Sequence, residues 1–316
     1  MQAQRVEVIG SGQTLGAMIQ GLDLANEISG SQFDLILRAL GAYGVICFPR
    51  QGLTALQLKS FSSLFGELEV NVANAYQEPG IPEVMILSNI LENAKPIGLA
   101  DAGQGWHTDM SYSRTIAFAN VLHAIKVPVR NGVTLGATQF SSMHAAYEDL
   151  PADKKTRLEG LTATHDFAKF WDMMRDRGSQ RPPLTEAQRN AKPPVSHPVV
   201  MIHPITGRKV LYANPGYTVR INELAHEDSD ELLNFLFAHQ LQQKYRYEHR
   251  WQEGDVLMWE NIGTIHNAVA DYGPDEPRLI RRCQVMATMP WRRRNGGASG
   301  ALDHAGDAIA RHTRST

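Results

Sequence analysis

The sequence has few of the features that mark secreted, disulfide-bonded or membrane proteins. Its two cysteines, Cys47 and Cys283, are too few for a disulfide framework, so a reducing compartment is expected. No segment reaches the roughly 18 consecutive apolar residues of a membrane-spanning helix. The first residues, MQAQRVEVIGSG, lack the apolar stretch of a secretory signal. These absences predict a cytoplasmic location.

A strong net charge is also missing. The chain has 33 acidic and 31 basic residues, a formal net charge of −2, so neither nucleic acid nor an anionic membrane is expected as a partner. No internal repeat is visible. We expect one domain over residues 1–291. The Gly/Ala/Arg-rich segment 292–316 has little to bury, which predicts a disordered tail. The sequence leaves open whether the chain forms a homo-oligomer.

Two stretches near the N-terminus have the apolar spacing of amphipathic helices. In SQFDLILRALGAYG, apolar residues recur at i, i+3, i+4 and i+7 from Phe33, and Ser31 with Asp34 is the expected cap pair. In TALQLKSFSSLFG, Thr54 is the expected cap and Gly66 the expected end. These stretches predict helices beside the strands that follow.

From residue 84 onward, short runs rich in β-branched and aromatic residues alternate with turn residues, which predicts a mainly β fold. HPITGRK is the expected hairpin turn between two of these runs. One clear helix, SDELLNFLFAHQLQQ, interrupts them, and the polar, proline-rich segment 178–196 is expected to be a long functional loop. The strand-like runs are VMILSN, TIAFANVLHAI, VTLGATQF, PVVMIHP, KVLYAN, DVLMWEN and RLIRRCQVMAT.

The segment GWHTDMSY, residues 105–112, places an imidazole and a carboxylate two positions apart. On a strand, His107 and Asp109 face the same way and Thr108 faces the other way. Such a pair supplies two members of a 2-His-1-carboxylate set, which suits non-haem Fe(II) enzymes. An isolated pair of this kind is more often a surface or hydrogen-bonded feature, so the prediction needs a second histidine.

His266 is the best candidate for that histidine, because it lies between two strand-like runs. Downstream, Arg278 and Arg282 are four residues apart and share a face of a strand, while Arg281 points away. An arginine there can reach the same cavity from the next strand and hold a carboxylate through two hydrogen bonds.

With these residues, the sequence resembles the taurine dioxygenase / 2,4-dichlorophenoxyacetate dioxygenase family of Fe(II)- and 2-oxoglutarate-dependent oxygenases. The resemblance covers roughly residues 5–290 and extends over GVICFPRQGLT, FGELE, GWHTDMSY, HPVV, HPITGRKVLYAN, FLFAH, WQEGDVLMWEN and the H-x11-R-x3-R spacing. It implies a double-stranded β-helix (jelly roll) with helices packed outside, and an oxidoreductase that uses Fe(II), 2-oxoglutarate and O2.

The resemblance also assigns roles to residues. His107, Asp109 and His266 would bind iron, and Arg278 would hold 2-oxoglutarate with help from Thr134, which lies in NGVTLGATQF where relatives have Gly-Gly-Asp before the threonine. Substrate contacts would come from Arg282, Asn74, Tyr76, Tyr112 and Phe167.

The implied reaction is hydroxylation of a small anionic molecule, with succinate and CO2 as coproducts. Cleavage of a C–S or C–O bond could follow when the hydroxylated carbon carries sulfur or oxygen. Two alternatives stay open: a metal-dependent hydrolase that uses the same ligands, and a jelly-roll binding protein without turnover. A carboxylate at Asp109 favours hydroxylation over halogenation, which needs a vacant ligand position for halide.

Overall fold

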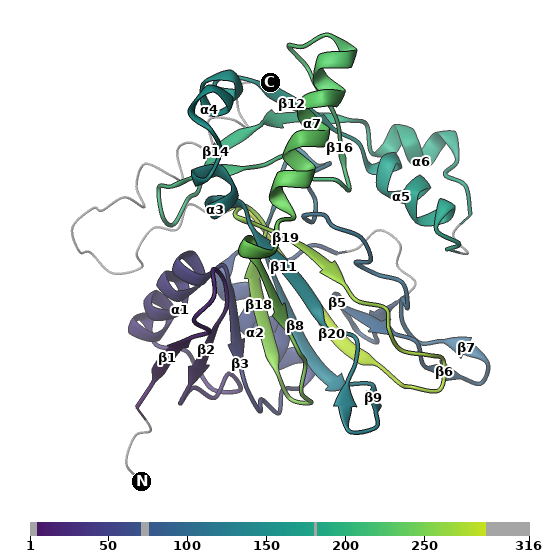
Figure 1. The fold of residues 1–316 in the computed structure, drawn as a ribbon. Helices are drawn as coiled ribbons and strands as arrows, with labels where there is room; N and C mark the ends of the chain where they lie inside the picture. Colours follow the sequence, from purple (N-terminus) through teal and green to yellow (C-terminus); the bar gives the residue numbers. More distant parts are fainter. Residues whose placement is uncertain (1–4, 71–75, 180–181, 289–316) are drawn as a thin grey trace.

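A large, mostly antiparallel sheet forms one wall of the protein in the computed structural model, which describes residues 5–70, 76–179 and 182–288 (Figure 1). Only β2 and β3 pair in parallel. In spatial order the strands are β1 (Glu7–Gly10), β2 (Ala17–Gln20), β3 (Val45–Phe48), β18 (Val256–Glu260), β8 (Ala117–Lys126), β20 (Leu279–Met286), β5 (Ile81–Ser88) and β4 (Gln77–Glu78).

A smaller sheet faces the large one and completes the jelly roll. Its order is β17 (Arg246–His249), β11 (Thr138–Ser142), β19 (Thr264–Ala268). The remaining strands pair as short sheets and hairpins around this core: β12 (Thr162–His165) with β13 (Val195–Pro198) and β16 (Thr218–Ile221), β14 (Val200–Ile202) with β15 (Lys209–Leu211), β9 (Val129–Arg130) with β10 (Val133–Thr134), and β6 (Leu91–Glu92) with β7 (Lys95–Pro96).

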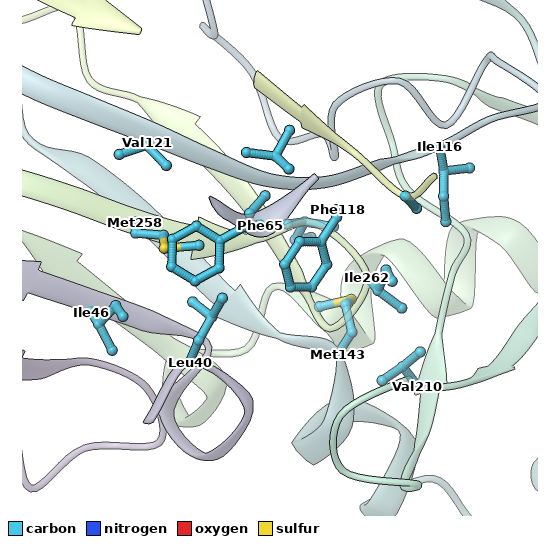
Figure 2. Close-up of a cluster of buried hydrophobic side chains, with 14 of the residues drawn as sticks. Leu40, Ile46, Phe65, Ile116, Phe118, Val121, Met143, Val210, Met258 and Ile262 are labelled. Carbon is cyan, nitrogen blue, oxygen red and sulfur yellow. The ribbon is translucent and has the colours of Figure 1, made fainter. Parts of the chain in front are cut away.

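Side chains alternate between the two faces of the large sheet. On β3, Ile46 and Phe48 pack toward the helices, whereas Val45 and Cys47 point into the space between the sheets. The helix-facing core includes Leu40, Phe65, Phe118 and Met258 and continues to Met143, Val210 and Ile262 (Figure 2). The other face of the sheet is turned toward the smaller sheet.

Two helices cover the outer face of the large sheet, α1 (Gly30–Tyr43) and α2 (Ala55–Ser62), as Figure 1 shows. Thr54 caps α2 as predicted, and η1 (Ser63–Phe65) carries the chain to Gly66. The predicted cap pair of α1 is wrong, because Ser29 and Gln32 form the capping box two residues earlier and leave Ser31 inside the helix. The helix ends at Gly44.

The other helices gather with the small sheets at the opposite end of the molecule (Figure 1). The sequence predicted one of them, and the structure contains several shorter ones as well. The loop expected over 178–196 also holds a helix of its own. These helices are α3 (Met143–Glu148), α4 (Ala152–Leu158), α5 (Phe167–Asp176), α6 (Glu186–Ala191), α7 (His226–Gln240) and the turn η2 (Gln243–Tyr245).

The predicted hairpin at HPITGRK is present between β14 and β15. The predicted tail, residues 292–316, lies outside the described residues. Within the described residues, no helix is long and apolar enough to cross a bilayer.

Candidate active site

The segment around His107, which the sequence predicts to bind metal, pairs with β19 of the small sheet. His107 exchanges two backbone hydrogen bonds with His266 of β19, at 3.0 and 2.8 Å. The strand expected over 105–112 is wrong, since His107 forms an isolated bridge and the chain turns directly after it, with Met110 at φ 58°. The expected orientation still holds, because Asp109 comes back toward His107 while Thr108 donates to the Asn261 carbonyl on the other side.

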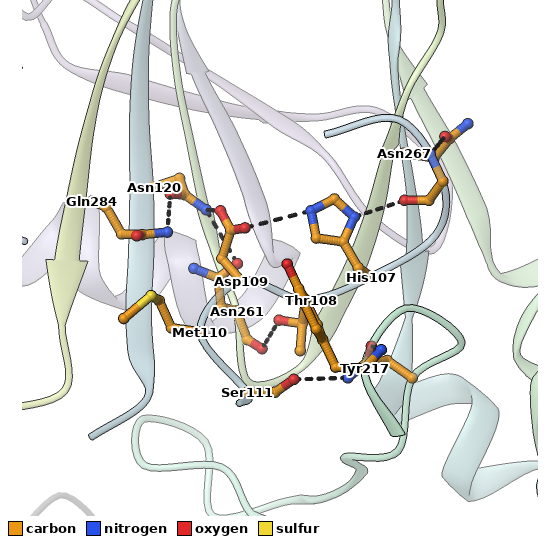
Figure 3. Close-up of polar contacts among 12 residues, drawn as sticks. His107, Thr108, Asp109, Met110, Ser111, Asn120, Tyr217, Asn261, Asn267 and Gln284 are labelled. Carbon is orange, nitrogen blue, oxygen red and sulfur yellow. Dashed lines mark hydrogen bonds and ion pairs between the residues drawn. The ribbon is translucent and has the colours of Figure 1, made fainter. Parts of the chain in front are cut away.

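The structure brings His107, Asp109 and His266 together between the two sheets, with a ligand atom of each within 4.8 Å of the others. Nδ1 of His107 lies 2.7 Å from the Gly105 carbonyl, so it carries the proton and leaves Nε2 as a lone pair, 3.4 Å from Oδ1 of Asp109 (Figure 3). Nδ1 of the buried His266 ring has no hydrogen-bond partner. These donors fit a divalent metal with two imidazoles and one carboxylate.

Electrostatics keep the cluster in the form that binds a cation. Burial alone would raise the pKa of Asp109, but the adjacent imidazole of His107 and the positive charge of Arg282 hold that pKa well below its usual range. Burial, reinforced by His107, lowers the pKa of His266 to about 3. Near neutral pH the carboxylate is therefore ionised and the imidazole of His266 is neutral.

A buried polar network positions the carboxylate (Figure 3). Asn120 on β8 donates to Oδ2 of Asp109 at 3.0 Å and to the side chain of Asn261 at 3.2 Å. Gln284 on β20 in turn donates to the Asn120 side-chain oxygen at 3.2 Å. The sequence prediction missed these residues, because nothing in the local pattern of a strand marks an amide that will meet a distant carboxylate.

The arginines of β20 are arranged as the four-residue spacing predicted. Arg282 points to the interior, with Nη1 3.3 Å from Oδ2 of Asp109. Arg281 points to the opposite face and forms an ion pair with Glu78 at 2.8 Å. The side chain of Arg282 keeps 17% of its surface exposed, so its charge can also reach a bound molecule.

Arg278 lies directly before β20 and is buried, with its guanidinium 5.8 Å from the centre of the Tyr272 ring. Burial lowers the pKa of Arg278, and its backbone is held by Asn89 and Ser88. Among the described ion pairs no carboxylate contacts this guanidinium, which meets Tyr272, so an anionic ligand would balance its buried charge. Thr134 lies on β10, half-buried. The chain approaches Arg278 at Gly136, where an added Cβ would come within 3.3 Å of Nε.

Aromatic rings pack against His107 from the side of α5. Phe170 lies 4.8 Å and Tyr217 6.0 Å from the His107 ring, and the two rings pack on each other at 5.1 Å. Tyr112 packs against both Tyr217 and the predicted substrate residue Phe167, at 4.8 and 5.0 Å. Phe170 and Tyr217 were not predicted. Phe170 comes from α5, which follows β12, and Tyr217 directly precedes β16, the strand that pairs with β12.

Two further predicted substrate residues lie in the segment that precedes β5. Asn74 is outside the described residues. Tyr76 is half-buried, and its carbonyl accepts a hydrogen bond from the Ile86 amide. The structure therefore places the backbone of Tyr76 beside β5 and gives no contact of its ring with the metal-binding cluster.

Known proteins resemble this chain in sequence and fold. The model of the family "Taurine catabolism dioxygenase TauD, TfdA family" matches residues 7–284. The chain belongs to this family. It is therefore an Fe(II)- and 2-oxoglutarate-dependent dioxygenase, which confirms the predicted reaction class, cofactors and jelly-roll fold.

Individual relatives agree over most of their length. Pentalenolactone F synthase of Streptomyces arenae is 31% identical over 293 residues, 89% of this chain and 96% of the relative. The alpha-ketoglutarate-dependent 2,4-dichlorophenoxyacetate dioxygenase of Cupriavidus pinatubonensis is 31% identical, with 85% and 94% covered. The crystal structure of AAD-2 with Mn(II) and N-oxalylglycine is similar with a TM-score of 0.74, at 26% identity, with 90% of this chain and 99% of that chain covered.

Proposed function

We propose that the chain hydroxylates a small molecule that combines an anionic group with an apolar body. In this proposal His107, Asp109 and His266 hold Fe(II), and Arg278 binds the distal carboxylate of 2-oxoglutarate. Arg282 binds the anionic group of the substrate. The observation that carries the proposal is the convergence of two imidazoles, one carboxylate and Arg282, with the buried Arg278 directly before the same strand.

The role of Arg278 rests on its burial without a carboxylate partner among the described ion pairs. A dicarboxylate that reaches it from the metal would satisfy its charge through paired hydrogen bonds. Thr134 is proposed to assist from β10, because the same segment approaches Arg278 at Gly136.

The side chains around the site support this substrate class. Tyr112, Phe167, Phe170 and Tyr217 offer an apolar surface beside His107, and Arg282 offers a positive charge beside Asp109. Relatives bear names of matching chemistry, among them 2,4-dichlorophenoxyacetate dioxygenase and the alpha-ketoglutarate-dependent sulfate ester dioxygenase of Pseudomonas putida. An aryl- or alkyl-bearing carboxylate or sulfate ester fits both features.

Bound Fe(II) and 2-oxoglutarate supply O2 activation coupled to decarboxylation, which yields succinate and CO2 and hydroxylates a nearby C–H bond. The residues of the chain decide which bond that is. Arg282 anchors the anionic end, and the aromatic rings hold the apolar body and exclude water. When the hydroxylated carbon carries an ether or sulfate ester oxygen, its C–O bond breaks and releases the attached group.

Succinate formation tests the proposal. Protein loaded with Fe(II) under nitrogen is given 2-oxoglutarate and air, with a panel of aryloxy acids, sulfate esters, sulfonates and amino-acid derivatives. We expect stimulation by anionic members that have an apolar body, and little by amino-acid derivatives. Stimulation confined to neutral compounds would overturn the substrate class. Turnover of a compound under nitrogen without 2-oxoglutarate would instead favour the hydrolase reading.

A further inference from the structure

A second cluster of potential metal ligands lies in the core, apart from the active site. Cys47 is on β3 of the large sheet, Asp255 directly precedes β18, and His249 ends β17 of the small sheet. All three are buried, with exposures of 5, 4 and 7%. One ligand atom from each lies within 4.8 Å of the others. We propose that Cys47, His249 and Asp255 form a second, structural metal site that takes Zn²⁺.

The contact between His249 and Asp255 has the geometry of two ligands rather than of a hydrogen bond. Nε2 of His249 lies 3.2 Å from Oδ2 of Asp255, yet this buried nitrogen makes no hydrogen bond within the described residues. Zn–N and Zn–O bonds of about 2.0–2.1 Å in a tetrahedron separate neighbouring ligand atoms by roughly 3.3 Å. The observed separation is close to that edge.

The carboxylate is already oriented for this role. The backbone amide of Gln252 donates to Oδ2 of Asp255 at 3.0 Å, which fixes the group in the way that outer hydrogen bonds fix metal ligands. Among the described ion pairs, Asp255 faces only His249. No lysine or arginine pairs with this buried carboxylate among the described ion pairs, and a divalent cation would supply a positive charge.

The donor types select the metal. Thiolate, imidazole and carboxylate together suit Zn²⁺, whereas the ligand set of His107, Asp109 and His266 contains no sulfur. Burial raises the pKa of the Cys47 thiol, so Zn²⁺ would have to displace its proton on binding. The three protein ligands leave the fourth tetrahedral position to a water molecule.

A third cluster with ligand atoms at similar distances, His144, His203 and Glu260, serves as a contrast. Nδ1 of His203 accepts hydrogen bonds from the backbone amides of Ile205 and Thr206, both at 3.3 Å. Its Nε2 must therefore carry the proton that faces Glu260 at 3.1 Å, which leaves no lone pair for a metal. The contrast rests on His203, since both ring nitrogens of His144 lack a hydrogen-bond partner within the described residues.

The location of the Cys47 cluster gives the metal a structural consequence. It would link β3 and β18 of the large sheet to β17 of the small sheet, at the turn that joins β17 to β18. Cys47 shares its hydrophobic cluster with Phe140 and Trp259, whose rings lie 6.3 and 4.9 Å from the His266 ring. The cross-link would stabilise the wall behind the active site.

Cobalt substitution tests the proposal, because a thiolate ligand gives Co²⁺ a near-ultraviolet charge-transfer band. The predicted active-site ligands are two imidazoles and a carboxylate, which cannot produce this band. We expect the band in the wild-type protein titrated with Co²⁺ under nitrogen, and its loss when Zn²⁺ is added. Cys47→Ser should abolish the band, while Cys283→Ser, which removes the other buried thiol, should retain it. Asp255→Asn and His249→Gln should weaken or shift it.

Zinc content gives an independent readout. Wild-type protein and Cys283→Ser, dialysed against Zn²⁺ and then freed of loose metal, should keep more zinc than Cys47→Ser, with circular dichroism used to check folding. Absence of the thiolate band in folded wild-type protein would overturn the proposal, as would its persistence in Cys47→Ser. The wild-type titration decides the matter even when a variant fails to fold.

Discussion

At the scale of the residue, the site consists of charged groups whose states are set by their immediate partners. Asp109 accepts from Asn120 and faces Arg282, and His107 is fixed in one tautomer by the Gly105 carbonyl. Spacing in the sequence was enough to propose that His107, Asp109 and His266 lie together, and the structure groups them. Asn120 and Gln284 could not be predicted, since their role depends on strands that meet only in the folded chain.

Asn120 is the clearest test of this network. Asn120→Ala removes the donor that orients Asp109, and loss of such an outer hydrogen bond lowers metal affinity by about 10–100-fold. Gln284→Leu removes only the contact behind Asn120 and should have a smaller effect. Anaerobic Fe(II) titration measures both. Equal affinity in the wild type and Asn120→Ala would rule out this positioning role.

Arg282 and Arg281 form a matched pair on opposite faces of β20. Arg282→Gln should raise the KM for an anionic substrate by roughly 10–100-fold, as expected for one lost charge-assisted hydrogen bond. Arg281→Gln, which breaks the pair with Glu78, should leave that KM near the wild-type value. Steady-state kinetics with a stimulating compound provide the test. An unchanged KM in Arg282→Gln would remove the arginine from the substrate site.

At the scale of the element, the apolar spacing of α1, α2 and α7 predicted helices correctly. Three of the helices that were missed, α3, α4 and α6, have only 6 or 7 residues, too few turns for a periodic signal, and α5, of 10 residues, was missed as well. The segment at 105–112 has strand-like residues but forms only a bridge, because the chain must turn at Met110 to bring Asp109 back toward His107. Here the site overrides local propensity.

The packing of the turn after β15 against the bridge at His107 can be tested with one methyl group. A Cβ at Gly216 would lie 2.6 Å from the Cβ of His107, too close without displacement. Gly216→Ala should therefore lower Fe(II) affinity by shifting His107. Gly52→Ala, where an added Cβ meets nothing within 4 Å, is the control. Identical iron affinity in the two variants would show that the site tolerates the shift.

At the scale of the whole molecule, two sheets enclose one interior, and α1 and α2 cover the outside of the large sheet. Sequence resemblance predicted this architecture and the reaction class. The three-dimensional clusters of buried histidines were not predictable, because their members come from elements far apart in the chain. They also make the fold sensitive to acid.

His144 illustrates that sensitivity. Burial, with a smaller contribution from His203, lowers the pKa of His144 from 6.5 to about 4, although Glu260 acts in the opposite direction. The unfolded chain therefore binds the proton first, and the free energy of unfolding should fall by about 2–4 kcal/mol as pH drops from about 6.5 to about 4. Stability from this group is fully present above that window.

Urea denaturation at pH 7.5 and pH 5 measures this loss. His144→Gln should reduce the difference between the two pH values, whereas His226→Gln, at an exposed histidine, should leave it unchanged. An equal pH dependence in wild type and His144→Gln would show that other groups control the acid response.

We propose that His107, Asp109 and His266 form the iron centre of this 2-oxoglutarate-dependent dioxygenase. The most direct measurement is succinate formation by Fe(II)-loaded protein given 2-oxoglutarate, in air and under nitrogen, for the wild type, Asp109→Ala and the surface control Asp153→Ala. We predict succinate in air alone, equal amounts from the wild type and Asp153→Ala, and none from Asp109→Ala. Undiminished succinate from Asp109→Ala, or none from iron-loaded wild type, would contradict the account.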